Sequence, residues 1–172
     1  MKKIIRQNVF ETNSSSCHAI CICTDKKLLE EIKHPKYLYF GIGKHGWEFE
    51  TLSTPEEKAN YLYTGILSCY KDKSKEKIEK LENMLSSFGC TAEFATPKWW
   101  EYEGEVYLDS DCGYVDHSDE LKEFIDEILD NPTLLYNYLF SDNSYVLKGN
   151  DNSEDTPEIY EHYNHYEYYK GN

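Results

Sequence analysis

Apolar residues recur every three or four positions from residue 54 to residue 88, and this spacing predicts two consecutive helices. Thr54-Pro55-Glu56-Glu57 begins the first helix, because it combines an N-cap, a proline at the first helical position and a capping-box glutamate. The second helix is predicted from Ser74 to Phe88, where Gly89 ends it. The predicted apolar face of the first helix consists of Ala59, Leu62, Tyr63, Ile66, Leu67 and Tyr70.

A second pair of helices is predicted closer to the C-terminus. Ser118 caps a helix that continues to Asp130, and Asn131-Pro132 opens a shorter one. A short helix that begins at Asp25 and stops before His34-Pro35 is also predicted. The helix from Ser118 has apolar residues along one side, at Leu121, Phe124, Ile125, Ile128 and Leu129.

Short apolar and aromatic runs between these helices predict strands. The runs are residues 4–10, 18–23, 37–40, 47–52, 91–96, 105–109 and 144–148. We therefore expect a single α+β domain over residues 1–150, in which a mixed sheet carries the helical hairpin and the second helix pair. Residues 151–172 are polar and then rich in tyrosine and histidine, and we expect them to form an acidic C-terminal arm.

Charge is distributed unevenly along the chain. The 172 residues carry a net charge of −14: residues 1–100 hold 15 Lys and Arg against 13 Asp and Glu, whereas residues 101–172 hold 3 against 19. Phosphate recognition requires clustered lysine and arginine, and the sequence contains one arginine, Arg6. The sequence therefore argues against direct nucleic-acid binding and favours a basic partner.

Hydropathy and the start of the chain bear on location. No apolar run is long enough to cross a bilayer, so we expect no membrane contact. The basic start Met1–Arg6 is not followed by the apolar region of a secretory signal. We expect a cytoplasmic protein with reduced cysteines.

The polar segment that leads into His18 is the first candidate site. A serine, Ser14 or Ser16, or the cysteine Cys17 would attack, His18 would act as general base, and Asn13 would polarise a carbonyl group. Asp116 and His117 are candidates to join this site, which would make the protein a small hydrolase or transferase. The alternative is a structural turn, since asparagine and serine satisfy backbone groups in turns, and we expect this structural role.

The segment from Phe10 to Ser16, Phe-Glu-Thr-Asn-Ser-Ser-Ser, with His18 two residues later, resembles the opening of a loose family of small, uncharacterised proteins. That family comes from bacteriophages and mobile elements of gut and soil bacteria, and its openings often have Thr or Met at position 17 and Ser at position 19. The segments Gly46–Glu50 and Tyr114–Ser118 are similar to the same group. The resemblance implies a phage or mobile-element gene and a location in the host bacterial cell, and it carries no catalytic role.

Metal ligands are present but are poorly spaced. Cys17, Cys21 and Cys23, then Cys112 with His117, lack the C-x2-C spacing that is typical of zinc sites. The acidic loop from Asp109 has a glycine in the wrong place for a calcium-binding loop. We expect no metal and no cofactor.

The helix from Ser118 is the candidate surface for a partner. Its carboxylates lie about 4.5, 6 and 10 Å apart along the helix axis, a scale comparable to the phosphates of a DNA strand, and only Lys122 offsets them. We expect this helix to imitate a nucleic-acid backbone and to enter the basic groove of a host nuclease or another nucleic-acid enzyme, a CRISPR nuclease first. The protein would then be an anti-CRISPR type of inhibitor. The candidate partner-binding residues are Asp119, Glu120, Glu123, Asp126, Glu127 and Asp130.

Overall fold

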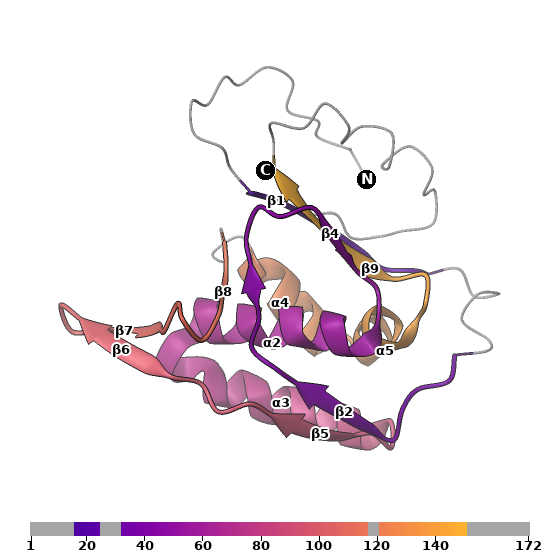
Figure 1. The fold of residues 1–172 in the computed structure, drawn as a ribbon. Helices are drawn as coiled ribbons and strands as arrows, with labels where there is room; N and C mark the ends of the chain where they lie inside the picture. Colours follow the sequence, from indigo (N-terminus) through magenta and orange to yellow (C-terminus); the bar gives the residue numbers. More distant parts are fainter. Residues whose placement is uncertain (1–15, 25–31, 117–120, 151–172) are drawn as a thin grey trace.

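The computed structural model describes residues 16–24, 32–116 and 121–150, coloured along the chain in Figure 1. The predicted strand at residues 4–10, the helix from Asp25 and the arm at residues 151–172 fall outside these residues. Within them, helices and strands combine in a small fold, and the expected α+β class is confirmed.

The helices confirm both predicted pairs. They are α2 (Pro55–Tyr70), α3 (Ser74–Ser87), α4 (Leu121–Asp130) and α5 (Pro132–Phe140), and the 3-10 turn η1 (Lys71–Lys73) joins α2 to α3. The capping box is present: the Glu57 N–H donates to the Thr54 hydroxyl, and the Thr54 N–H donates to the Glu57 carboxylate. Gly89, with a φ of +79°, ends α3 in the left-handed conformation that glycine favours.

Helix α2 lies at the centre of the fold. The sequence predicts one apolar face, but Lys58 and Tyr61 on its other sides are also buried, because α2 packs against α3, α4, α5 and β2. Lys58 has polar partners there: its Nζ atom donates to the carbonyl oxygens of Ser141 and Ser144, at 2.8 Å each. Lys58 of α2 thus binds the turn between α5 and β9.

The largest sheet is antiparallel and has the strand order β1-β9-β4. Strand β1 is Ser16–Cys21, β9 is Tyr145–Asn150 and β4 is Glu50–Leu52. The register places His18 opposite Lys148 and Lys148 opposite Glu50, so these three side chains form one row on one face of the sheet. The next row on that face lies in the core and consists of Ile20, Val146 and Leu52.

The remaining strands form three pairs. Strand β2 (Tyr37–Phe40) is parallel to β5 (Thr91–Phe94), and β3 (Lys44–His45) is parallel to β8 (Tyr114–Val115). Strand β6 (Trp99–Tyr102) is antiparallel to β7 (Glu105–Leu108). The described strands therefore form four small sheets in place of the one mixed sheet that we expected. Figure 1 shows the reason: β1-β9-β4 lies above α2 and β2-β5 lies below it, so the helices separate them.

The β6–β7 hairpin projects from the body of the fold (Figure 1). Its two-residue turn, Glu103-Gly104, has a positive φ at both residues, 52° and 81°, as a type I′ turn requires. All four residues of β6 are exposed. The sequence analysis placed a strand at β7 and missed β6.

Candidate functional site

His18 lies inside the protein and holds three segments together. It is 3% exposed, its Nδ1 atom is 3.0 Å from the hydroxyl of Tyr61, and its Nε2 atom is 2.9 Å from the carbonyl oxygen of Gly46. Because a carbonyl oxygen only accepts, Nε2 donates to Gly46, while Nδ1 shares a hydrogen bond with the Tyr61 hydroxyl. Both ring nitrogens are thus engaged, and general-base catalysis by His18 would require one of these bonds to break.

His45 is a second buried histidine beside the same tyrosine. The Tyr61 ring lies edge-on to both imidazoles, with ring centroids 5.7 Å from His18 and 5.1 Å from His45. His45 is 6% exposed, and neither of its ring nitrogens has a hydrogen-bond partner within the described part of the chain. Burial, with smaller contributions from Lys148 and His18, lowers the pKa of His45 from 6.5 to about 3. The ring is therefore neutral near pH 7.

The loop at residues 41–46 encloses the His45 ring. A Cβ atom at Gly43 would lie only 2.6 Å from Nε2 of His45, so the loop can close over the ring only with glycine at that position. The backbone of this loop also provides the Gly46 carbonyl oxygen that His18 contacts. Gly43 thus permits the close packing of this segment on His45.

Lys148 connects this buried row to the surface. Its Nζ atom lies 2.6 Å from Oε2 of Glu50, with side chains that are 3% and 52% exposed. The row of His18, Lys148 and Glu50 therefore runs across the sheet from the interior towards solvent. Its contacts fasten the sheet to α2 and to the loop at residues 41–46, which is a structural task.

Two other members of the candidate catalytic set, Ser16 and Asp116, fall within the described residues. Ser16 begins β1, opposite Asn150. Asp116 is exposed, and its backbone N–H donates to the carbonyl oxygen of His45 at 2.9 Å. Asn13, Ser14 and His117 lie outside the described residues. Of this set, the surroundings of His18 are those of a structural histidine.

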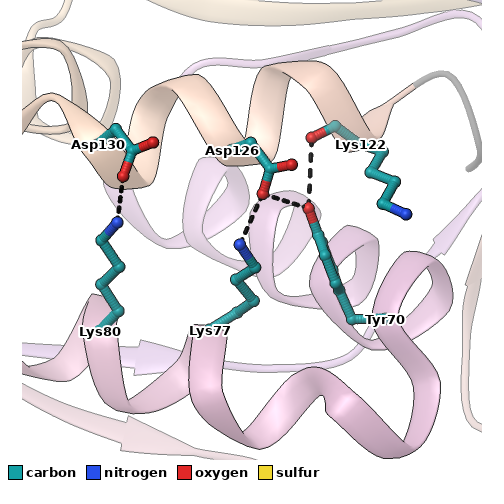
Figure 2. A network of polar contacts seen from close by, with 6 residues as sticks. All are labelled: Tyr70, Lys77, Lys80, Lys122, Asp126 and Asp130. Carbon is teal, nitrogen blue, oxygen red and sulfur yellow. Dashed lines mark hydrogen bonds and ion pairs between the residues drawn. The ribbon is translucent and has the colours of Figure 1, made fainter.

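The acidic helix α4 packs against α3 and the end of α2 through a polar network (Figure 2). The Nζ atom of Lys77 lies 2.7 Å from Oδ1 of Asp126, and the Tyr70 hydroxyl donates to the same oxygen at 2.5 Å. One turn further along, Lys80 forms an ion pair with Asp130. Two of the predicted partner-binding carboxylates are therefore bound to lysines of the same protein.

This network corrects the expectation that only Lys122 offsets the carboxylates of the helix. The helical hairpin lays α3 beside α4 and brings Lys77 to Asp126. Burial alone would raise the pKa of Asp126, but the hydrogen bonds from Lys77 and Tyr70 outweigh it, and the net pKa is lowered. Burial, and then the bond to Asp126, raise the pKa of Tyr70.

Glu123 and Glu127 are the carboxylates of α4 that still point into solvent. Both are exposed, and neither takes part in an ion pair with a described residue. They are four positions apart, so their side chains lie on one face, about 6 Å apart along the axis. Asp119 and Glu120 fall outside the described residues.

A surface that the sequence analysis did not single out lies on the β6–β7 hairpin and the loop after it. From residue 99 to residue 116 the sequence contains six carboxylates and no lysine, arginine or histidine. The exposed large side chains of β6 are Trp99, Trp100 and Tyr102. A count of charged and aromatic residues in short windows would have found this segment. The charge count of residues 1–100 and 101–172 did not show it, because the boundary at residue 100 falls inside the segment.

The comparisons with known proteins give no match. No protein-family model matches the sequence, and no curated protein or solved structure matches it significantly. The resemblance of the opening segment to phage proteins stays a sequence-based expectation. Among the described residues, no helix combines the length and the apolar character that a membrane span requires.

Proposed function

We propose that this protein is a non-catalytic inhibitor that binds a basic, nucleic-acid-handling host enzyme in the groove that normally holds DNA or RNA. One observation carries the proposal. Between residues 99 and 130 the described residues hold ten carboxylates and one lysine, Lys122, whereas the other described residues hold ten carboxylates and eleven lysines. Within residues 16–24, 32–116 and 121–150, the excess of acid over base is thus confined to the hairpin, the loop after it and α4.

This arrangement supports binding through charge. A surface with one sign of charge attracts a partner of the opposite sign, raises the rate of encounter and repels nucleic acid itself. On α4, Glu123 and Glu127 offer two solvated carboxylates at a spacing of a few ångströms, as phosphates along a strand do. The basic lining of a nucleic-acid groove is the kind of surface that fits both properties.

The proposed targets follow from the resemblance of the opening segment to phage and mobile-element proteins. A CRISPR nuclease is the first target to test, and a restriction enzyme is the second. The alternative of a small hydrolase receives no support from His18, since both of its ring nitrogens are engaged inside the protein.

Charge reversal on α4 tests the proposal. In the Glu123→Lys/Glu127→Lys variant we expect the fold to remain and binding to a purified CRISPR nuclease to fall at least about tenfold, since two attractions become repulsions. The control is Glu76→Lys/Glu82→Lys on α3, which changes the net charge equally at exposed positions outside the acidic region. Equal losses in both variants, or binding that does not change between low and high salt, would contradict the proposal.

Stoichiometry separates the proposal from the enzymatic alternative. An inhibitor of this kind blocks its target fully only near one molecule per target. Titration of nuclease activity against added protein should therefore end near equimolar amounts. Full inhibition by trace amounts, with a covalent change in the nuclease seen by mass spectrometry, would instead identify an enzyme.

A further inference from the structure

The β6–β7 hairpin carries a row of aromatic rings on one face. Trp100 stands opposite Tyr107 across the hairpin, with ring centroids 5.3 Å apart, and Tyr102 follows two residues later, 5.9 Å from Trp100. Trp100 and Tyr102 are 49% and 56% exposed. Large rings in this position do not contribute to the core, so their exposure calls for a partner.

One end of this face already holds a cation. The Nζ atom of Lys71 lies 4.1 Å from the centroid of the Tyr107 ring and 3.8 Å from Oε2 of Glu105. A ring and a carboxylate on one face of the hairpin thus bind an ammonium group of the same protein. The rings of Trp100 and Tyr102 continue this face, and no lysine of the described residues lies over them.

Carboxylates lie on both faces of the hairpin: Glu105 stands opposite Tyr102 on the same face as the rings, whereas the side chain of Glu101 alternates to the other face. Glu101 and Glu103 are exposed and lie beside Trp100 and Tyr102 in the sequence, and the segment contains no basic residue. A cation over an aromatic face gains from the quadrupole of the ring, and neighbouring carboxylates strengthen its attraction. Arginine suits such a face better than lysine, because its planar group stacks on rings and is weakly hydrated.

We propose that the Trp100–Tyr102 face of the β6–β7 hairpin is a docking surface for arginine side chains of a basic protein partner. The inference rests on the proposed function for the sign of the partner's charge. It adds which surface of this protein binds the partner and which side chains of the partner that surface recognises. In this arrangement the partner's arginines stack on Trp100 and Tyr102, as Lys71 packs on Tyr107, and the carboxylates of the hairpin strengthen the attraction at longer range.

An oligo-arginine peptide is the probe, and an oligo-citrulline peptide of equal length is its uncharged counterpart. Calorimetric titration at physiological salt should show binding of the arginine peptide only. In the Trp100→Leu/Tyr102→Leu variant we expect binding to weaken about tenfold, as the loss of two cation–π contacts predicts. The matched control is Trp47→Leu, which removes an aromatic ring of similar exposure, 57%, outside the hairpin.

The Tyr102→Leu single variant keeps the test decisive if the double variant disturbs the hairpin, because Tyr102 lies next to the turn. This single substitution should by itself weaken binding severalfold. Equal affinities of the hairpin variants and the Trp47→Leu control would overturn the inference, as would equal binding of the citrulline peptide. Sedimentation of the protein alone tests whether a second copy of the chain occupies this face. A dimer that dissociates in the Trp100→Leu/Tyr102→Leu variant would assign the face to self-association and overturn the inference.

The same measurements separate this inference from the proposed function. Loss of nuclease binding in Glu123→Lys/Glu127→Lys, with full binding in the hairpin variants, would overturn the docking surface and leave the proposed function standing. If the unmodified protein binds neither the arginine peptide nor the nuclease, both the docking surface and the proposed function are overturned.

Discussion

The Nζ atom of Lys77 lies 2.7 Å from Oδ1 of Asp126, although the two residues are 49 positions apart in the sequence. This contact ties α3 to α4 and removes one carboxylate from the acidic surface (Figure 2). The polar face of α4 therefore divides into carboxylates that bind lysines of α3, Asp126 and Asp130, and carboxylates that remain solvated, Glu123 and Glu127.

The Lys77–Asp126 pair should stabilise the fold measurably. A double-mutant cycle with Lys77→Met and Asp126→Asn should give a coupling free energy of about 0.5–1 kcal/mol, since both side chains are partly exposed. Urea denaturation at low and high salt measures it, and salt should reduce it. The control cycle is Lys75 with Glu79, a more exposed pair at 3.9 Å, for which we expect a smaller coupling. Equal coupling in both cycles would contradict the structural role of Lys77.

Replacement of His18 should affect stability before it affects function. His18→Ala leaves the Gly46 carbonyl oxygen and the Tyr61 hydroxyl without their partner, so we expect a loss of about 1–3 kcal/mol in the free energy of unfolding. Inhibition of the target should fall only in proportion to the folded fraction. Tyr61→Phe, which removes a single hydroxyl, should cost less. A His18→Ala protein that is fully stable and fully inactive would instead show that His18 is catalytic.

The buried ring of His45 should make the fold sensitive to acid. The unfolded chain takes up a proton at His45 as the pH falls below about 6.5, whereas the folded protein does so only near pH 3. Stability from this group is therefore complete above pH 6.5 and decreases towards pH 3, by up to about 1.4 kcal/mol per pH unit. Between pH 6.5 and pH 5, His45→Leu should reduce the slope of unfolding free energy against pH. An unchanged slope would show that the ring is accessible to protons in the fold.

The turn of the hairpin offers a test of its conformation. Gly104 has a φ of +81°, so Gly104→Ala should destabilise the hairpin by about 1 kcal/mol, although its Cβ would meet open space. Glu103 has a φ of 52°, and Glu103→Asn should stabilise the turn, because asparagine tolerates this conformation better. Hydrogen exchange of the amides from Trp99 to Leu108 measures both changes. A Gly104→Ala change that leaves the hairpin as stable as before, or a Glu103→Asn change that destabilises it, would mean that the turn is of another type.

The accuracy of the sequence analysis depends on how local each signal is. The capping box of Thr54 and Glu57 involves neighbouring residues, so the start of α2 could be read directly. The strand at Trp99–Tyr102 was missed because its apolar residues do not alternate and because Glu-Gly is a weaker turn signal than Asn-Gly.

Long-range pairing could not be predicted from one sequence. The row of His18 and Lys148 depends on the register of β1 against β9, and the Lys77–Asp126 contact depends on the packing of α3 on α4. Neither the strand register nor the helix packing can be inferred from the local spacing of residues. The structure therefore adds most where distant segments meet: it supplies the partners of His18, for which a structural role was expected, and it turns a carboxylate expected to be solvated, Asp126, into half of an ion pair.

The place of β9 in the sheet determines the order in which the protein can form during synthesis. Strands β1 and β4 both pair with β9, and among the described strands neither has another neighbour. The ribosome makes β1 and β4 first, so both wait for residues 145–150, while the hairpin of α2 and α3 can form earlier from local contacts. The sheet is thus completed late, and nascent chains expose the edges of β1 and β4 to other strands until β9 arrives.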